Sequence, residues 1–425
     1  MLRFVSTSLL LTLAGLAEVH TITLQEAVNL ALKQSPEVVE ARLDEQHARE
    51  AVRIAKDPFT PKVYGGSGLA YTNGYPNSIE GSAPAIFEAR TNMALFNRQQ
   101  SFQLASARET ARGAALDTQS KNEDVAYRTA SLFLDAQQAA RAARSIAGEV
   151  ESLERVAESV RTRVAEGREI PLESKRAELN VARARQRASA FAADQDYAES
   201  SLALVLGFPA GDRVHATDDE INRARIPESE QAAVKAALEN SREIRHLESQ
   251  LQARMLELRG YQSARLPVID LVAQYSLLAK HNYQEFFNKF QRHNGQLGVA
   301  ITIPLLVGAA SKGYVSQAEV DIAKMRAQVN DARNRIGVDT AKSYQDVSRA
   351  ESAREVARLD LDVQREQVTV LLAQLNEGRI TRTSVDEARM MEQEKWIAYY
   401  DSQNVVEKAK LNLLRQTGTI LAALR

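Results

Sequence analysis

Histidines are the residues of this 425-residue chain best suited to metal binding and proton transfer. The six are His20, His47, His215, His246, His281 and His293. No two of them stand four residues apart, and no His-Glu-x-x-His sequence occurs, so the spacing of a helical zinc site is missing. His281 and His293 flank an expected loop, and we interpret them as solvated residues rather than metal ligands. The histidines therefore predict no metal site.

Other residue types that carry chemistry also lack the necessary spacing. Gly65-Gly66-Ser67-Gly68 has no lysine and no following helix, so it is not a phosphate-binding loop. Met390 and Met391 are adjacent and would point apart on a helix, and no Gly-x-Ser-x-Gly sequence is present. The absence of cysteine excludes thiolate nucleophiles, disulfides and an N-terminal lipoprotein anchor. We expect neither enzymatic activity nor a cofactor.

Charge and hydropathy limit the possible partners. Lys+Arg number 54 and Asp+Glu number 55, so the chain has no overall field for nucleic acid, and we expect none as a partner. No apolar run reaches the ~18 residues of a membrane-spanning helix, so membrane insertion would have to use strands. Residues 1–17 carry Arg3, an apolar stretch and a small-residue end, which is typical of a secretory signal peptide.

The rest of the chain contains two copies of one unit. At an offset of 211, Glu166-Gly167-Arg168 falls on Glu377-Gly378-Arg379, and the match continues without gaps for about eighty residues. Upstream the offset is 206, where Ala27-Val28 falls on Ala233-Val234. We expect repeats at 18–211 and 229–425, joined by a linker at 212–228.

Each repeat contains a very long helix followed by a returning helix. Apolar residues alternate at spacings of three and four, which indicates a coiled-coil seam. The first seam is Ile146, Val150, Leu153, Ala157, Val160 and Val164, and its counterpart is Ala357, Leu361, Gln364, Val368, Leu371 and Leu375. The expected helices are about 98–165 and 172–206 in the first repeat and about 310–376 and 383–424 in the second. A helix of that length, roughly 100 Å, excludes a compact globule.

Strands are expected before each long helix, because apolar and polar residues alternate there with period two. The expected strands are about 61–72, 85–97, 267–279 and 295–307. Their length suits a tilted strand across a bilayer, although two half-buried hairpins on a soluble core would show the same alternation. Four strands cannot close a barrel, whose smallest form has about eight, so closure would need two or three chains.

Taken together, these features resemble the TolC-like outer-membrane efflux protein family over essentially the whole mature chain. The most specific likeness is the turn after each long helix, where the family has Gly, an acidic residue six positions later and Ala four further on. The copies here are Gly167, Glu173 and Ala177, and Gly378, Ser384 and Ala388. Ser384 departs from the acidic position, and Arg168 and Arg379 replace a residue that is often apolar.

The resemblance implies a mainly helical fold with duplicated long antiparallel coiled-coil helices and four transmembrane strands per chain. A homotrimer would close a 12-stranded β-barrel in outer-membrane lipid above a periplasmic α-barrel. The implied function is the exit duct of a tripartite efflux or type I secretion system, with a periplasmic membrane-fusion adaptor and an inner-membrane transporter of RND, ABC or MFS type. The alternative is a non-membrane coiled-coil scaffold or periplasmic adaptor.

The resemblance also assigns roles to residues at the turns. The adaptor-docking tips would be Gly167, Arg168, Ile170, Glu173, Gly378, Arg379, Ile380 and Ser384. Asp386 and Glu387 would narrow the periplasmic entrance. These residues are the candidate functional site.

Overall fold

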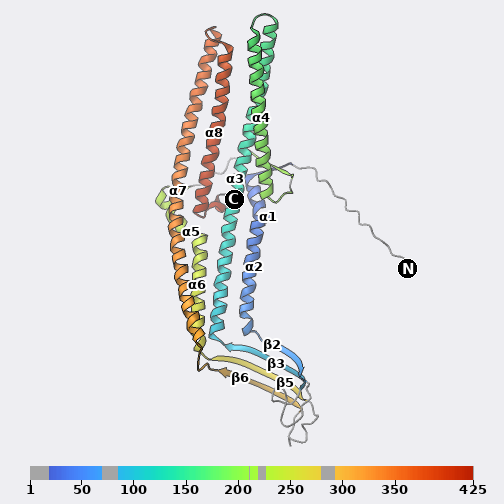
Figure 1. Ribbon diagram of the computed structural model, residues 1–425, viewed down its shortest axis with the longest axis vertical. Coiled ribbons are helices and arrows are strands. Elements are labelled where there is room, and N and C mark those ends of the chain that lie inside the picture. Colours follow the sequence, from blue (N-terminus) through green and yellow to red (C-terminus); the bar gives the residue numbers. More distant parts are fainter. Residues whose placement is uncertain (1–18, 69–84, 210, 219–225, 279–291, 425) are drawn as a thin grey trace, which may run out of the picture. The chain divides into compact units, whose positions relative to one another are not determined.

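The protein is described by a computed structural model covering residues 19–68, 85–209, 211–218, 226–278 and 292–424, so the expected signal segment 1–17 lies outside the described residues (Figure 1). The helices are α1 (Leu24–Gln34), α2 (Pro36–Lys56), α3 (Arg98–Ala165), α4 (Pro171–Val205), α5 (Glu230–Asn240), α6 (Arg242–Gln262), α7 (Ala309–Asn376), α8 (Arg382–Gln416) and α9 (Ile420–Ala423). The strands are β1 (Val19–Ile22), β2 (Lys62–Gly68), β3 (Ala85–Phe96), β4 (Arg213–Ala216), β5 (Val268–Leu278) and β6 (His293–Thr302). Single 3-10 turns, η1 (Asp57–Phe59) and η2 (Ser263–Arg265), precede β2 and β5.

Two compact units form, and they cut across the sequence repeats. Unit 1 contains the residues up to Glu40 together with Gln119–Ser241 and Asn334–Arg425. Unit 2 contains Ala41–Thr118 and Arg242–Arg333. Each unit therefore takes equivalent pieces of both repeats.

The duplication is preserved in the bounds of the helices. Helices α3 and α7 each have 68 residues, and α4 and α8 each have 35. Their starts differ by the offset found in the sequence, since 309 − 98 = 211 and 382 − 171 = 211. The two repeats thus form two helical hairpins of the same length.

Both hairpins of unit 1 use the expected seams. In α3, Ile146, Leu153 and Val160 are buried, and Leu153 packs with Val181 and Ala184 of α4. In α7, Leu361, Gln364 and Val368 are buried at the matching positions. Gln364 is the polar exception, and its side-chain amide donates a 3.0 Å hydrogen bond to the Ala388 carbonyl of α8. This bond satisfies a buried donor that would otherwise destabilise the seam.

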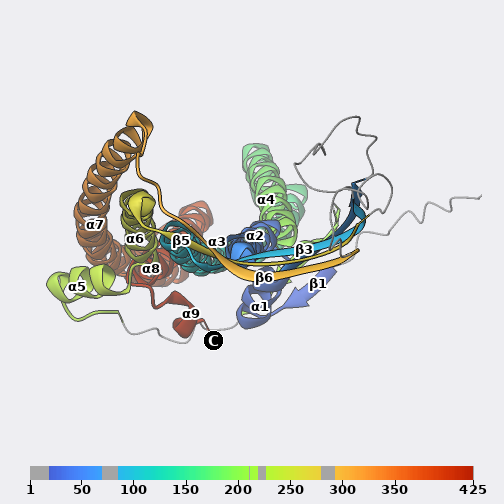
Figure 2. The same ribbon diagram turned by 90° about the horizontal axis from the view of Figure 1, so that it is seen from below.

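Polar contacts join the two hairpins along α3 and α8, which lie side by side in Figures 1 and 2. Asp135 accepts hydrogen bonds from Lys408 at 2.7 Å and from Asn404 at 2.9 Å, and Asp124 accepts one from Arg415 at 2.9 Å. Further along, Gln138 donates to Asp401 and Gln393 donates to Ser145. The seam between the hairpins is therefore largely polar. Helices α7 and α4 lie on its outer sides (Figures 1 and 2).

The largest core of unit 1 lies where α1, α3, α4, α8 and α9 meet. Phe133 of α3 is almost completely buried there, together with Leu202 and Leu206. Strands β1 and β4 pair in parallel beside this core, with Val19 opposite Arg213. Strand β4 lies inside the segment 212–228 that the sequence indicated as a linker. Four-residue strands are too short to show a period, so their pairing depends on a partner far away in the chain.

Unit 2 contains a four-stranded antiparallel sheet in the order β2-β3-β5-β6 (Figure 2). Its register aligns the faces: Thr91 lies opposite Val63 and Ala273, and Ala273 lies opposite Leu297. On the other face, Arg90 lies opposite Tyr64 and Gln274. One face is therefore mainly apolar and the other polar across all four strands. Every residue of β6 is exposed, so no core of the described residues covers that strand.

Two expected elements end earlier than the sequence indicated. Strand β6 stops at Thr302 instead of 307, just before Pro304, which has no N–H to donate to a ladder. The expected helix 383–424 is divided, because α8 ends at Gln416 and α9 begins at Ile420. Gly418 between them has φ 69°, and the Thr419 N–H bonds to the Leu414 carbonyl, which closes α8.

Among the residues that the structure describes, no helix is both long and apolar enough to cross a membrane.

Candidate functional site

The two helical turns of unit 1 have the same backbone geometry. Gly167 and Gly378 each have φ 71°, a conformation that side chains other than glycine resist. The Gly167 N–H bonds to the Val164 carbonyl and the Arg168 N–H to the Arg163 carbonyl, at 3.0 and 2.8 Å. Gly378 and Arg379 repeat both bonds in the second hairpin. This arrangement caps the last carbonyls of a helix and reverses the chain within a few residues.

Arginine follows each glycine and projects from the turn. Arg168 lies 3.2 Å from Glu166, and Arg379 lies 3.0 Å from Glu377. About three quarters of each arginine side chain is exposed, so these ion pairs contribute little stability and leave the guanidinium groups accessible. Ile170 is also exposed, whereas Ile380 is half-buried. Each turn thus presents a cation beside an apolar residue.

Glu173 and Ser384 occupy equivalent positions in the first turns of α4 and α8 but have different partners. Glu173 accepts a 2.8 Å hydrogen bond from Arg176 and a 3.2 Å bond from the Thr383 hydroxyl of α8. It therefore joins the two hairpins. Ser384 instead lies 3.2 Å from the Thr381 hydroxyl at the start of its own helix. The departure at Ser384 removes a carboxylate from the second turn while the first keeps it.

Asp386 and Glu387 are adjacent but face different surroundings. Asp386 is half-buried and lines a small cavity of about 30 Å³ together with Glu173, Arg176 and Thr383. Burial raises the pKa of the Asp386 carboxyl, and the guanidinium groups of Arg382, Arg389 and Arg163 oppose the shift. Glu387 is exposed. The structure therefore separates the two residues that the sequence analysis grouped.

A third carboxylate, Glu149 of α3, was not found from the sequence. Its side chain is 7% exposed, and neither carboxylate oxygen has a hydrogen-bond partner among the described residues. Arg187 of α4 lies 3.7 Å from Glu149 and 3.7 Å from Glu394 of α8, so one cation serves two carboxylates. Burial raises the pKa of Glu149, Arg187 lowers it and Glu394 raises it again. The one sequence feature that could have indicated the burial of Glu149 was its position beside the seam residues Ile146, Val150 and Leu153.

The histidines that the structure describes are dispersed. His246 contacts the Gly113 carbonyl at 2.8 Å, His215 contacts Glu199 at 3.0 Å, and His293 contacts the Tyr275 hydroxyl at 2.6 Å. His281 lies outside the described residues. Within the described ranges, no group of three or more His, Asp or Glu residues is arranged to hold a metal ion.

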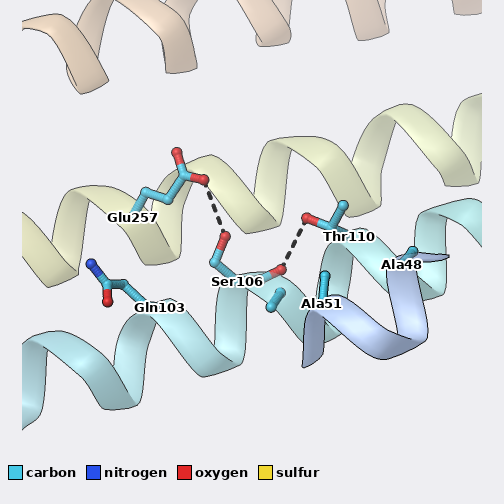
Figure 3. Close-up of a pocket in the computed structure, with 7 residues that line it drawn as sticks. Ala48, Ala51, Gln103, Ser106, Thr110 and Glu257 are labelled. Atoms are coloured by element: carbon cyan, nitrogen blue, oxygen red, sulfur yellow. Dashed lines mark hydrogen bonds between the residues drawn. The ribbon is translucent and has the colours of Figure 1, made fainter. Parts of the chain in front are cut away.

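A larger hollow of about 280 Å³ lies in unit 2 between α2, α3 and α6 (Figure 3). Ala48 and Ala51 line one side, and Ser106 donates a 3.3 Å hydrogen bond to Glu257 on the other. Arg254 also donates to Glu257, at 2.8 Å. The lining contains no histidine, lysine or cysteine to activate the serine, so it has no arrangement for nucleophilic catalysis.

Comparison with known proteins assigns the fold to a family. A family model described as outer membrane efflux protein matches residues 27–208 and 233–419, one match in each repeat. The chain belongs to the outer membrane efflux protein family. It is an outer-membrane efflux channel of the kind used by tripartite efflux systems, and its long helices form the periplasmic part. The family match confirms the resemblance and the non-enzymatic function expected from the sequence, and it decides against the alternative of a non-membrane coiled-coil scaffold or periplasmic adaptor.

Solved structures share this fold at low sequence identity. A membrane protein from Pseudomonas aeruginosa is 15% identical, with a TM-score of 0.75 over 93% of this chain and 92% of that one. The CmeC outer membrane channel of Campylobacter jejuni is 12% identical, with a TM-score of 0.75 over 93% and 86%. The outer membrane protein VceC of Vibrio cholerae is 14% identical, with a TM-score of 0.72 over 94% and 95%. A comparison with curated proteins found no match.

Proposed function

We propose that three copies of this efflux channel assemble into the exit duct of a tripartite efflux or type I secretion system. The observation that carries the proposal is the sheet of unit 2, whose outer strands β2 and β6 each have a free edge among the described residues. Free edges are not tolerated in hydrocarbon, so β6 of one copy would pair with β2 of the next. Three copies would contribute twelve strands, with the apolar face toward lipid and the polar face toward a water-filled lumen.

The helical turns are the proposed docking surface for a periplasmic membrane-fusion adaptor. Four features support this role: capped turns that hold one conformation, accessible cations at Arg168 and Arg379, an exposed Ile170, and helix starts joined by Glu173 and Thr383. An adaptor with apolar and acidic groups at its own tip would complement them. The adaptor would link the duct to an inner-membrane transporter of RND, ABC or MFS type, which would select the substrate.

The proposed entrance constriction contains Asp386 and Glu387. Threefold symmetry would bring three copies of each carboxylate toward one axis, where like charges repel unless cations or basic partners balance them. The exposed Glu387 is the residue of the pair with free access to ions, whereas Asp386 faces three arginines of its own chain. We assign control of cation block to Glu387 and positioning of the α8 start to Asp386.

Assembly is tested by light scattering of the purified mature protein in detergent. The expected result is a trimer, because each copy alone leaves two strand edges free. A monodisperse monomer would refute the proposed duct, and a dimer would contradict the threefold arrangement.

The entrance is tested by single-channel recording in planar bilayers. Glu387→Ala should change conductance and weaken block by divalent cations, while Glu394→Ala, an exposed glutamate two turns further along α8, serves as the control. If Glu387→Ala showed the same conductance and the same cation block as the Glu394→Ala control, Glu387 would not belong to the entrance constriction. The proposed duct itself would not be affected by that result.

The tips are tested by efflux from cells. Gly167→Pro or Gly378→Pro should abolish efflux while trimers still reach the outer membrane, because proline cannot adopt φ 71°. Normal efflux in both variants would show that the capped turns do not dock a partner.

A further inference from the structure

The hollow between α2, α3 and α6 has an apolar wall and a polar wall (Figure 3). Ala48 and Ala51 of α2 form the apolar wall, and Ala107 of α3 adds a third methyl group. Glu257 of α6 lies on the opposite wall, where its carboxylate faces the Ser106 hydroxyl. An engineered apolar cavity of about 150 Å³ binds benzene, so this hollow of about 280 Å³ has room for an aromatic ring and a short polar arm.

The second repeat has long side chains at the positions that form the apolar wall. Helices α2 and α6 start 206 residues apart, since 242 − 36 = 206. Ala48 is therefore equivalent to Arg254, and Ala51 is equivalent to Glu257. Two alanines thus stand in the first repeat where the second repeat has two charged residues, and they leave the space beside α3 open.

An aromatic pair of the second repeat is also missing from the first. Tyr261 of α6 stacks on Tyr314 of α7, with ring centroids 5.4 Å apart and 17° between the ring planes. The equivalent residues are Ala55 and Gln103, by the offsets of 206 and 211. Gln103 is exposed and lines the hollow, and no aromatic residue lines it within the described ranges. The first repeat therefore leaves room at positions where the second repeat packs two rings.

Glu257 is the one charged residue in the described lining of the hollow. Its Oε1 accepts a 3.3 Å hydrogen bond from Ser106, and its Oε2 accepts a 2.8 Å bond from Arg254. An ionised carboxylate offers about four lone-pair sites, so about half of this acceptor capacity is left for a ligand. A donor that enters the hollow therefore finds an anionic acceptor beside an apolar surface.

Arg254 does not prevent a second cation from reaching Glu257. Half of the Arg254 side chain is exposed, and exposed ion pairs contribute little stability. Glu257 raises the pKa of the Arg254 guanidinium, and Asp321 of α7 adds to this effect. Arg254 therefore has a second carboxylate that attracts it when a ligand occupies Glu257.

We propose that the hollow binds a small aromatic molecule that carries a protonated amine. The ring would pack against Ala48 and Ala51, and the ammonium group would donate to the Glu257 carboxylate. Apolar walls with one polar group that fixes orientation are the usual composition of a small-molecule site. The lining residues all belong to unit 2 of one copy, so the site does not depend on the proposed trimer.

A ligand in the hollow would connect the three helices that lead to the sheet of unit 2. Helix α2 precedes β2, α3 follows β3 and α6 precedes β5. A molecule that binds the folded chain but not the unfolded chain stabilises the fold. Binding should therefore raise the unfolding temperature of the protein as well as change the signal of the ligand.

Fluorine NMR of para-fluorobenzylamine tests the site with the purified full chain in detergent at neutral pH. We expect saturable binding with a dissociation constant of about 1 mM, as for a ligand of this size, and a higher unfolding temperature at saturation. The alcohol para-fluorobenzyl alcohol has the same ring without the charge. It should bind about tenfold more weakly, because it cannot form the charge-assisted hydrogen bond.

A substitution on α6 tests the carboxylate. Glu257→Gln should weaken binding of the amine about tenfold and leave binding of the alcohol nearly unchanged. The matched control is Glu248→Gln, because Glu248 also lies on α6 and accepts a 2.6 Å bond from Arg333 but does not line the hollow. The control should bind the amine as the unchanged chain does. Equal binding by the two variants, or equal binding of amine and alcohol, would overturn the role of Glu257 and the ligand class with it.

Two further variants fill the hollow. Ala51→Leu adds apolar volume on α2, and Gln103→Tyr introduces the ring that Tyr314 has in the second repeat. Both should abolish saturable binding, and Gln103→Tyr decides the test if Ala51→Leu disturbs helix packing, because Gln103 is exposed. If the unchanged chain shows no saturable binding, or if the folded variants bind as it does, the ligand is not held in the hollow and the proposal is wrong.

Discussion

Replacing Arg187 with methionine should destabilise the helical hairpins of unit 1 through Glu149. Methionine keeps much of the length and apolar contact of arginine but removes the charge that faces the buried carboxylate. Glu149 is 7% exposed and its oxygens have no hydrogen-bond partner among the described residues, so Arg187 is the cation placed to compensate it. Breaking a buried pair costs ~3–5 kcal/mol, and because Arg187 itself is about one third exposed we expect about 2–3 kcal/mol.

The loss should depend on pH in a defined direction. The pKa of Glu149 in the folded protein is raised above its ordinary value of 4.5. Between pH 4.5 and this raised pKa, the folded protein therefore binds the Glu149 proton more tightly than the unfolded chain does. Stability therefore falls as pH rises from 4.5 through the folded pKa. Removing Arg187 raises the folded pKa further, so the deficit of Arg187→Met should be largest at pH 8 and nearly absent at pH 4.

Urea unfolding followed by the helical circular dichroism signal, at pH 4 and at pH 8, provides the measurement. Arg185→Met is the matched control on the same helix, because Arg185 pairs with Glu154 at 2.6 Å with both side chains largely exposed. The control should lose less than about 1 kcal/mol at either pH. Adding Glu149→Gln to Arg187→Met should recover most of the loss. If Arg187→Met and Arg185→Met behave alike at pH 8, the buried carboxylate does not depend on Arg187 and the reasoning fails.

Three further predictions use the same unfolding assay. Gly378→Ala should cost about 1–2 kcal/mol of unfolding free energy because φ is 71°, whereas Gly148→Ala in mid-helix should stabilise the protein by about 0.5–1 kcal/mol. An added methyl group would meet no atom within 4 Å at either position, so the two substitutions differ only in backbone conformation. Similar effects of both would argue against backbone strain at the turn. Gln364→Leu should hardly change the stability, but Gln364→Glu should cost about 1–3 kcal/mol, because a carboxylate cannot donate to the Ala388 carbonyl. If Gln364→Glu left the stability unchanged, this seam would be open to water. Phe133→Ala should cost about 3–5 kcal/mol, because Phe133 is the largest fully buried side chain of the main core; a loss below about 1 kcal/mol would show that neighbouring side chains fill the cavity.

The sequence by itself determined the elements whose pattern is local. A coiled-coil seam depends on side chains three and four positions apart, so Ile146, Leu153 and Val160 were identifiable without a partner helix. The strands were identifiable from period two, and the turns from the Glu-Gly-Arg sequence that both repeats share. Each feature found in one repeat then predicted an equivalent feature 211 residues away in the other repeat. The observed bounds of α3 and α7 differ by that number.

Tertiary structure decided everything that depends on residues far apart in the chain. The compact units mix both repeats, because the start of α3 packs with segments of unit 2 and the remainder with segments of unit 1. The parallel pairing of β1 with β4 joins residues 19 and 213 through strands too short to show a period. The different surroundings of Asp386 and Glu387 follow from which side of α8 faces the first hairpin.

Glu149 shows most directly why the burial of a charged residue could not be predicted from the sequence. In the sequence it is one glutamate among many on a long helix, and charged residues on such a helix are ordinarily solvated. Its burial arises only because α4 and α8 approach α3 at the same height and bring Arg187 and Glu394 to it. The apolar periodicity of a helix depends on residues close together in the sequence, so it can be recognised from the sequence alone. The burial of a side chain depends on which other helices pack against it, so only the tertiary structure decides it.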